Sequence, residues 1–158
     1  MAATPKELTN ILLVEDDEVD VLAVKRGFVH YQIDNPLHVA RDGIQALEML
    51  RGTNGVKAIP RPLLILLDLN TPRMNGLQFL TELRSDPDLC DHVVFVLTTS
   101  NSSSDRAAAY QKNVAGYIVK DCVGDGFLQV IQMLECFLLT VDLPESRPTA
   151  VPDSVHNA

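Results

Sequence analysis

The sequence predicts an α/β protein with a doubly wound, five-stranded parallel sheet flanked by five helices. Short apolar segments alternate strictly with longer amphipathic segments along the chain. The most apolar of them, LLILL at residues 63–67, is typical of a strand buried on both faces of a parallel sheet. The 158 residues, 46% of them apolar and 22% charged, are enough for a single domain with its own core.

The first two units each combine a short strand with an amphipathic helix. NILLV, residues 10–14, is expected as a strand, and residues 17–29 follow as a helix that Asp17 is suited to begin. PLHVA, residues 36–40, is the second expected strand. Residues 42–52 form the next expected helix, because they carry an amphipathic pattern and end on a glycine.

The next two units contain the strongest strand signals. The apolar strand at residues 62–67 is followed by turn residues and then by a predicted helix at residues 75–85. HVVFVL, residues 92–97, is the fourth expected strand. Residues 102–113 begin with serines that favour a helix start and continue into an alanine-rich helix.

The last unit joins GYIV, a strand at residues 116–119, to a long apolar helix at residues 124–141. Residues 1–9 are expected as an N-terminal extension and residues 10–141 as the folded domain. Residues 142–158 are rich in proline and polar side chains, and they are therefore expected as a flexible tail.

Composition excludes several classes of protein. A net charge of −8 disfavours binding to nucleic acid or to an anionic membrane, since both need a surplus of Lys and Arg. No apolar run approaches the roughly 18 residues of a membrane span, and the first ten residues lack a signal-peptide core. Three cysteines without C-x-x-C spacing are expected as reduced, mostly buried thiols. These features predict a cytoplasmic protein.

Polar residues follow four of the five expected strands. Asp68 follows the most buried strand, Thr98 follows the fourth and Lys120 follows the fifth. Glu15 and Asp16 follow the first, together with Asp17, which is better suited to beginning the helix. In doubly wound sheets the ligand site lies outside the carboxyl ends of the strands, where the strand order switches. We therefore expect three carboxylates, a hydroxyl and an ammonium group to converge there.

This combination of groups suits phosphoryl transfer. Clustered carboxylates repel one another and normally hold a hard cation, for which Mg²⁺ is the best candidate. A magnesium ion and a lysine would neutralise the charge of the phosphoryl oxygens, while a hydroxyl donates a hydrogen bond. Asp68 is the natural acceptor, because aspartate is a recognised nucleophile that forms an aspartyl phosphate.

Four motifs carry a resemblance to a known family. ILLVEDD, LLDLNTPRMNG, VLTTS and GYIVK, in this order and spacing, resemble the receiver domain of two-component response regulators, the CheY-like family. The resemblance covers residues 10–141. It implies the flavodoxin-like receiver fold and signalling through protein contacts rather than enzymatic turnover. It also implies that a sensor histidine kinase supplies the phosphoryl group from a phosphohistidine.

The resemblance assigns a metal site. It implies that Asp68 is the phosphoacceptor and a ligand of Mg²⁺. Glu15 and Asp16 correspond to the acidic pair of the family, with Asp16 binding the ion directly and Glu15 acting largely through water. The backbone carbonyl of Asn70 corresponds to a further metal ligand.

The resemblance also assigns the switch. Lys120 corresponds to the lysine that contacts the phosphate, and Tyr117 to the aromatic partner of the switch. Counting back from Lys120 with the spacing of the family selects Thr98 as the switch hydroxyl. Thr99, directly beside it, is the competing candidate.

Secondary cues point to a subfamily. Asp121 follows the lysine where the family usually has proline, and we expect the peptide between them to be trans. This departure, together with TTS and the Leu-Pro that ends the last helix, is similar to single-domain regulators paired with bacterial phytochromes. No output domain is expected after the last helix, and the expected kinase is a bacteriophytochrome.

Two other functions compete with this interpretation. DLNTP resembles the D-x-D-x-T opening of haloacid-dehalogenase-type phosphatases, which also form an aspartyl phosphate. There the second aspartate exchanges a proton, and here its position is Asn70, whose amide cannot do so. The other rival is a degenerate receiver that binds its partner without phosphorylation.

The last helix has more apolar residues than are needed to pack one of its faces against the core. An apolar stripe suited to the core is formed by Phe127, Val130, Ile131, Leu134 and Leu138. Further apolar residues mostly lie away from that stripe: Leu128, Met133, Phe137 and Leu139. Such a surface usually marks an interface. Its simplest partner is a second copy of the chain, paired about a two-fold axis. The alternative is that the C-terminal segment folds back and covers this surface, but residues 142–154 have few apolar groups with which to do so. We therefore expect a homodimer through this helix.

Overall fold

A single parallel sheet forms the centre of the computed structural model, which describes residues 8–120 and 125–145. The sheet has five strands in the order β2-β1-β3-β4-β5. Their bounds are β1 (Asn10–Val14), β2 (Leu37–Ala40), β3 (Leu63–Leu67), β4 (Val93–Thr98) and β5 (Gly116–Val119). Every neighbouring pair is parallel, so the predicted fold class is confirmed.

In the part of the chain that the structure describes, four helices connect successive strands and a fifth follows β5, as the alternating pattern predicts. Their bounds are α1 (Glu18–His30), α2 (Gly43–Arg51), α3 (Gly76–Ser85), α4 (Ser103–Gln111) and α5 (Asp125–Thr140). Asp17 accepts hydrogen bonds from two backbone N–H groups at the start of α1, and Ser102 caps α4. Gly52 ends α2 in the left-handed conformation, with φ of 71°, which favours glycine. Every expected element is present within two residues of its predicted bounds.

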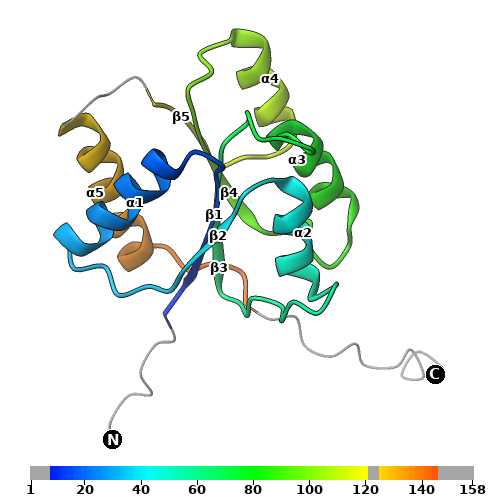
Figure 1. The fold of residues 1–158 in the computed structure, drawn as a ribbon, viewed down its shortest axis with the longest axis horizontal. Coiled ribbons are helices and arrows are strands. Elements are labelled where there is room, and N and C mark those ends of the chain that lie inside the picture. Colours follow the sequence, from blue (N-terminus) through cyan, green and yellow to red (C-terminus); the bar gives the residue numbers. More distant parts are fainter. Residues whose placement is uncertain (1–7, 121–124, 146–158) are drawn as a thin grey trace, which may run out of the picture.

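The helices cover the two faces of the sheet unequally (Figure 1). One face packs against α2, α3 and α4, whose buried residues include Leu47, Phe79 and Ala109. The other face packs against α1 and α5 through Phe28 and Ile131. Side chains of β1 and β3 alternate between the two cores, which explains why both strands are apolar along their whole length.

Helix α5 differs from the expectation at Phe137, and Leu128 is half-buried rather than exposed. Ile131 and Leu134 are buried as expected, and Met133 and Leu139 are exposed by 38% and 78%. Phe137, however, is half-buried and packs edge-to-face on Phe95 with ring centroids 5.0 Å apart, so its expected outward position is wrong. The side chain of Phe127 lies outside the described residues.

The end of the described chain turns back onto the fold. Leu143, inside the segment expected as a tail, is 9% exposed and joins the core beneath α1 and α5. Residues 146–158, most of that segment, lie outside the described residues, so the flexible tail stays a prediction. The expected trans peptide at Asp121 also lies outside them.

Two expectations drawn from composition have different outcomes. In the described ranges, no helix has the length and apolar character required to cross a bilayer. The cysteines were expected to be mostly buried, but Cys136 is exposed and Cys90 is half-buried, while Cys122 lies outside the described residues. The positions of Cys136 on a helix surface and of Cys90 in a loop explain this, because neither is in a core-facing stripe.

Candidate functional site

The strand register brings the polar residues together at the carboxyl edge of the sheet. Val14, the last residue of β1, lies opposite both Ala40 and Leu67. The residue after each strand continues the ladder, because Asp68 N–H donates to Val14 O at 3.0 Å. In the same way Lys120 N–H donates to Thr98 O at 2.6 Å. The backbone therefore fixes where these side chains start.

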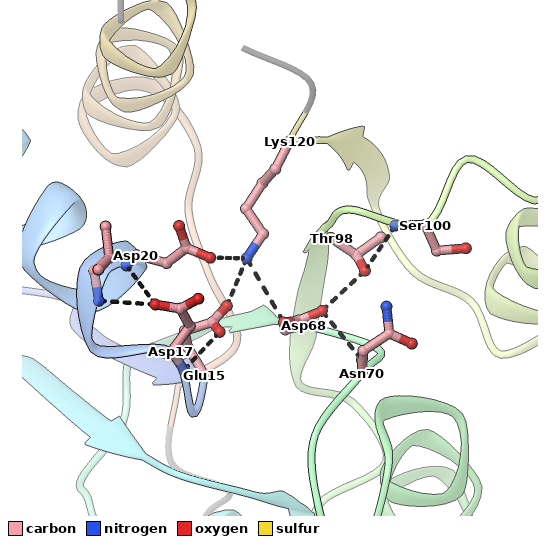
Figure 2. A network of polar contacts seen from close by, with 9 residues as sticks. Glu15, Asp17, Asp20, Asp68, Asn70, Thr98, Ser100 and Lys120 are labelled. Atoms are coloured by element: carbon pink, nitrogen blue, oxygen red, sulfur yellow. Dashed lines mark hydrogen bonds and ion pairs between the residues drawn. The ribbon is translucent and has the colours of Figure 1, made fainter. Parts of the chain in front are cut away.

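Asp68 occupies the centre of the site and is 6% exposed. Its Oδ1 accepts hydrogen bonds from Thr98 Oγ1 at 2.9 Å and from the backbone N–H of Asn70 at 3.1 Å. Its Oδ2 faces Lys120 Nζ at 3.6 Å (Figure 2). One oxygen is thus held by two donors, and the other is directed toward a cation.

Three carboxylates form a group that can hold a divalent cation. Ligand oxygens of Glu15, Asp16 and Asp68 all lie within 4.8 Å of one another. Glu15 and Asp68 are buried, whereas Asp16 is exposed to solvent. Buried carboxylates this close repel strongly, and an oxygen-rich set open to water fits a hard divalent ion. Asn70 is exposed, and its backbone carbonyl stays a predicted ligand.

Glu15 and Lys120 form the closest ion pair of the site, with 2.6 Å between Oε2 and Nζ. Burial raises the pKa of Glu15 to about 7, against the hydrogen bond from Lys120, while the nearby charge of Asp68 raises it further. Burial alone would lower the pKa of Lys120, but hydrogen bonds to Asp20 and Glu15 hold it above its usual value. Lys120 therefore stays charged.

Asp20 is a member of this network that sequence reasoning missed. It lies in the first turn of α1, and its Oδ2 is 2.8 Å from Lys120 Nζ (Figure 2). An acid in a first helical turn is common because it interacts well with the helix dipole, so it carries no functional signal of its own.

The two threonines at the end of β4 differ in burial and in their contact with Asp68. Thr98 is fully buried and reaches Asp68, whereas Thr99 is exposed. Tyr117 forms no hydrogen bond with Thr98 or Asp68. Its hydroxyl donates instead to Ser100 O at 2.8 Å. The guanidinium of Arg106 lies 5.4 Å from the centre of the Tyr117 ring, in cation–π range. The tyrosine thus contacts the loop that follows Thr98.

Close contacts on two sides hold the loop at residues 69–75, which follows Asp68. Gly76 N–H donates to Leu69 O at 3.0 Å, and a Cβ at Gly76 would lie 2.7 Å from the backbone oxygen of Asp68. On the other side, Arg73 Nε donates to Asp42 Oδ2 at 2.7 Å. Burial alone would raise the pKa of Asp42, but the hydrogen bond from Arg73 helps to hold it below its usual value. The loop is therefore built around close contacts.

Known proteins are similar to this chain in both sequence and fold. The profile of the response regulator receiver domain matches residues 11–132. Response regulator Rcp1 of Synechocystis is 39% identical over 135 residues, which are 85% of this chain and 92% of that protein. The crystal structure of its Mn²⁺-bound form has a TM-score of 0.79 and covers 86% of this chain and 99% of that chain.

Two further structures are similar over most of the chain. The phosphorylated cyanobacterial phytochrome response regulator RcpA is 31% identical, with a TM-score of 0.77, and covers 88% of this chain and 100% of that chain. A response regulator in red light signalling of R. palustris is 30% identical, with a TM-score of 0.76 and the same two coverages.

Proposed function

The chain belongs to the response regulator receiver family, and from this premise we propose that Asp68 accepts a phosphoryl group from a phosphohistidine of a sensor kinase. Receiver domains of this family signal through protein contacts rather than catalytic turnover, so the chain is not an enzyme. The arrangement of Asp68 is the observation that carries the proposal. Oδ1 is held by Thr98 and the Asn70 N–H, which leaves Oδ2 free to attack beside Lys120.

The proposed step forms one bond and breaks one. Asp68 Oδ2 attacks the phosphorus, the new O–P bond forms, and the N–P bond of the phosphohistidine breaks. The imidazole leaves with the electron pair of that bond and takes its proton from solvent. Lys120 stabilises the negative charge on the phosphoryl oxygens, and its charged state is secured by its carboxylate partners.

A divalent cation fits this site, and we propose that it is Mg²⁺. Asp16, Asp68 and the Asn70 carbonyl would bind it, with Glu15 acting largely through water. Its chemistry is to neutralise charge on the transferring phosphoryl group. The close carboxylates and the Mn²⁺-bound structure of Rcp1 support a divalent ion here, and the preference of Mg²⁺ for oxygen ligands and retained waters supports this choice.

Thr98 and Tyr117 are proposed as the switch. Once Asp68 is phosphorylated, the Thr98 hydroxyl turns from Oδ1 to a phosphoryl oxygen and draws the loop after β4 with it. Tyr117 holds that loop through Ser100, so a movement of the loop changes the position of the ring. This would alter the surface next to α4 and β5 that a partner protein reads.

The proposed kinase is a bacteriophytochrome, and the proposed compartment is the cytoplasm. Two similar proteins, RcpA and the R. palustris regulator, are described as phytochrome or red-light regulators, which supports the pairing. The exposed thiol of Cys136 suits a reducing compartment. No nucleic-acid partner is proposed, since the net charge of −8 disfavours one.

A homodimer through α5 is also proposed. Met133 and Leu139 are exposed apolar residues on this helix, and Val141 follows it with 38% exposure. Such residues are disfavoured on the surface of a monomer when they cluster. Phe137→Asp is a poor test, because Phe137 packs on Phe95 inside the monomer. Light scattering should instead compare the wild type with Met133→Asp: a dimer that becomes a folded monomer supports the interface, and a monomeric wild type rejects it.

Phosphotransfer tests the main proposal. Purified bacteriophytochrome kinase, autophosphorylated with labelled ATP, should transfer its label to the wild type in Mg²⁺ within minutes and not to Asp68→Asn. Asp91→Asn is the matched control, since it removes an aspartate at the opposite edge of the sheet. Labelling of Asp68→Asn at the wild-type stoichiometry would overturn the assignment. Labelling of the wild type by other histidine kinases alone would keep Asp68 and reject the phytochrome pairing.

A further inference from the structure

Three carboxylates surround Lys120, and they differ in burial and in whether they can also bind a metal ion. Its Nζ lies 2.6 Å from Glu15 Oε2, 2.8 Å from Asp20 Oδ2 and 3.6 Å from Asp68 Oδ2. The side chain of Lys120 is 7% exposed and that of Glu15 3%, whereas Asp20 is 34% exposed. Figure 2 shows Asp20 reaching the ammonium from α1, on the side away from Asp68.

Metal binding would change the charges around this lysine. Glu15 and Asp68 belong to the carboxylate group that can hold a divalent ion, and Asp20 does not belong to it. An ion at that group would offset the negative charge of two of the three partners of Lys120 and would repel the ammonium directly. Asp20 is then the carboxylate whose charge the ion does not share.

We propose that Asp20 is a positioning residue that holds Lys120 beside Asp68 while the divalent ion is bound. Without it, the ammonium would compete with the ion for Glu15 and Asp68, and it would leave the site once the ion is bound. The purpose of the arrangement rests on the proposed phosphoryl transfer, but the positioning itself requires only Lys120 and the metal.

The geometry of the ammonium supports this role. A lysine ammonium has three N–H donors. One is bonded to Asp20 and one to Glu15, so the third remains for Asp68 or for a phosphoryl oxygen bound to it. Asp20 itself lies in the N-terminal turn of α1, where the helix dipole favours a carboxylate in its charged form.

Affinity for Mg²⁺ alone, measured by calorimetry, provides the first test. We expect Asp20→Asn to weaken Mg²⁺ binding at least fivefold, because the released lysine competes with the ion. Glu18→Gln removes the same charge from the same helical turn, at a side chain that is 82% exposed, and should change affinity less than twofold. Asp20→Glu, which restores the carboxylate, should recover most of the loss.

The same substitutions in a Lys120→Gln variant distinguish positioning of the lysine from a direct effect of the Asp20 charge on the ion. In Lys120→Gln, where no ammonium has to be held, Asp20→Asn should weaken Mg²⁺ binding no more than Glu18→Gln does. An equal fivefold loss in both backgrounds would overturn the proposal, since Asp20 would then act through its charge alone. An unchanged affinity in Asp20→Asn with Lys120 present would overturn it as well.

A third readout needs the metal but no phosphorylation. In protein saturated with Mg²⁺, Lys120 should react several-fold faster with an acylating reagent in Asp20→Asn than in Glu18→Gln, as measured by peptide mass spectrometry. Equal rates would contradict the positioning role. These readouts are independent of phosphotransfer, so a chain that passes them without accepting a phosphoryl group would reject the proposed function and leave the positioning role standing.

Discussion

Cationic side chains at the two edges of the sheet have different surroundings. At the amino edge, Arg84 donates to the carbonyls of Lys112, Cys90, His92 and Asn113 at 2.7–3.1 Å. Arg61 nearby forms two hydrogen bonds with Asp91. At the carboxyl edge, Lys120 faces carboxylates, and Asp16 adds a further negative charge beside them.

The charged groups at the amino edge stabilise the fold, whereas those at the carboxyl edge suit ligand binding. At the amino edge each cation is balanced by backbone carbonyls or by one carboxylate, so those groups stabilise the loops that they join. At the carboxyl edge the negative charges outnumber the single lysine, which leaves the site short of positive charge. We infer that the amino edge holds the fold together, whereas the carboxyl edge is kept unbalanced in order to bind a cation and a phosphoryl group.

Removing Arg84 should have the largest effect on stability. Arg84→Met leaves several carbonyls without their donor, and we expect the free energy of unfolding to fall by about 3 kcal/mol. Urea denaturation measures this loss. Mg²⁺ affinity of the folded variant should stay within twofold of the wild type, because the site lies at the other edge. A large loss of Mg²⁺ affinity in a fully folded variant would break the comparison.

Acid should weaken the amino edge through His92. Burial lowers the pKa of His92 from 6.5 to about 4 in the folded protein. Between these values the unfolded chain binds the proton and the folded chain does not, so stability falls as the pH drops below 6.5. The loss reaches about 2 kcal/mol at pH 5. His92→Gln should lose this part of the pH dependence in thermal or urea denaturation, and an unchanged profile would contradict the assignment.

The smallest expected effect on stability is a gain, produced by a substitution at the carboxyl edge. Asp16→Asn removes one of three mutually repelling carboxylates, so we expect it to stabilise the metal-free protein by about 0.5 kcal/mol. In millimolar Mg²⁺ the advantage should disappear, because the variant loses the stabilisation that bound metal provides. Glu18→Gln serves as the control for surface charge. Destabilisation of the metal-free protein by Asp16→Asn would show that the carboxyl edge is balanced after all.

Most of the fold could be predicted because its signals are local. The apolar run of β3, the caps Asp17 and Ser102 and the terminal Gly52 each act within a few residues of the structure that they determine. Asp68 was predictable for a different reason. The carboxyl ends of parallel strands meet at one edge, so its position after β3 sufficed to bring it near Lys120.

The remaining features depend on contacts between distant parts of the chain. The pairing of Asp20 with Lys120 joins residues 100 positions apart, and an acid at a helix start has a sufficient local explanation. Phe137 looked surface-facing by helical spacing, but the ring of Phe95 extends the core to reach it. Leu143 is one apolar residue in a polar segment, so no periodic pattern could indicate its burial.

The central claim is that Asp68 carries the phosphoryl group, and reduction of the phosphorylated protein tests it most directly. Borohydride converts an aspartyl phosphate into homoserine, which peptide mass spectrometry locates by residue. After phosphorylation in Mg²⁺ by a histidine kinase or a small acyl phosphate, we expect homoserine at position 68 and at no other aspartate. Homoserine at Asp16 or Asp20 instead, or a phosphoryl group that survives reduction on a serine or threonine, would contradict the account.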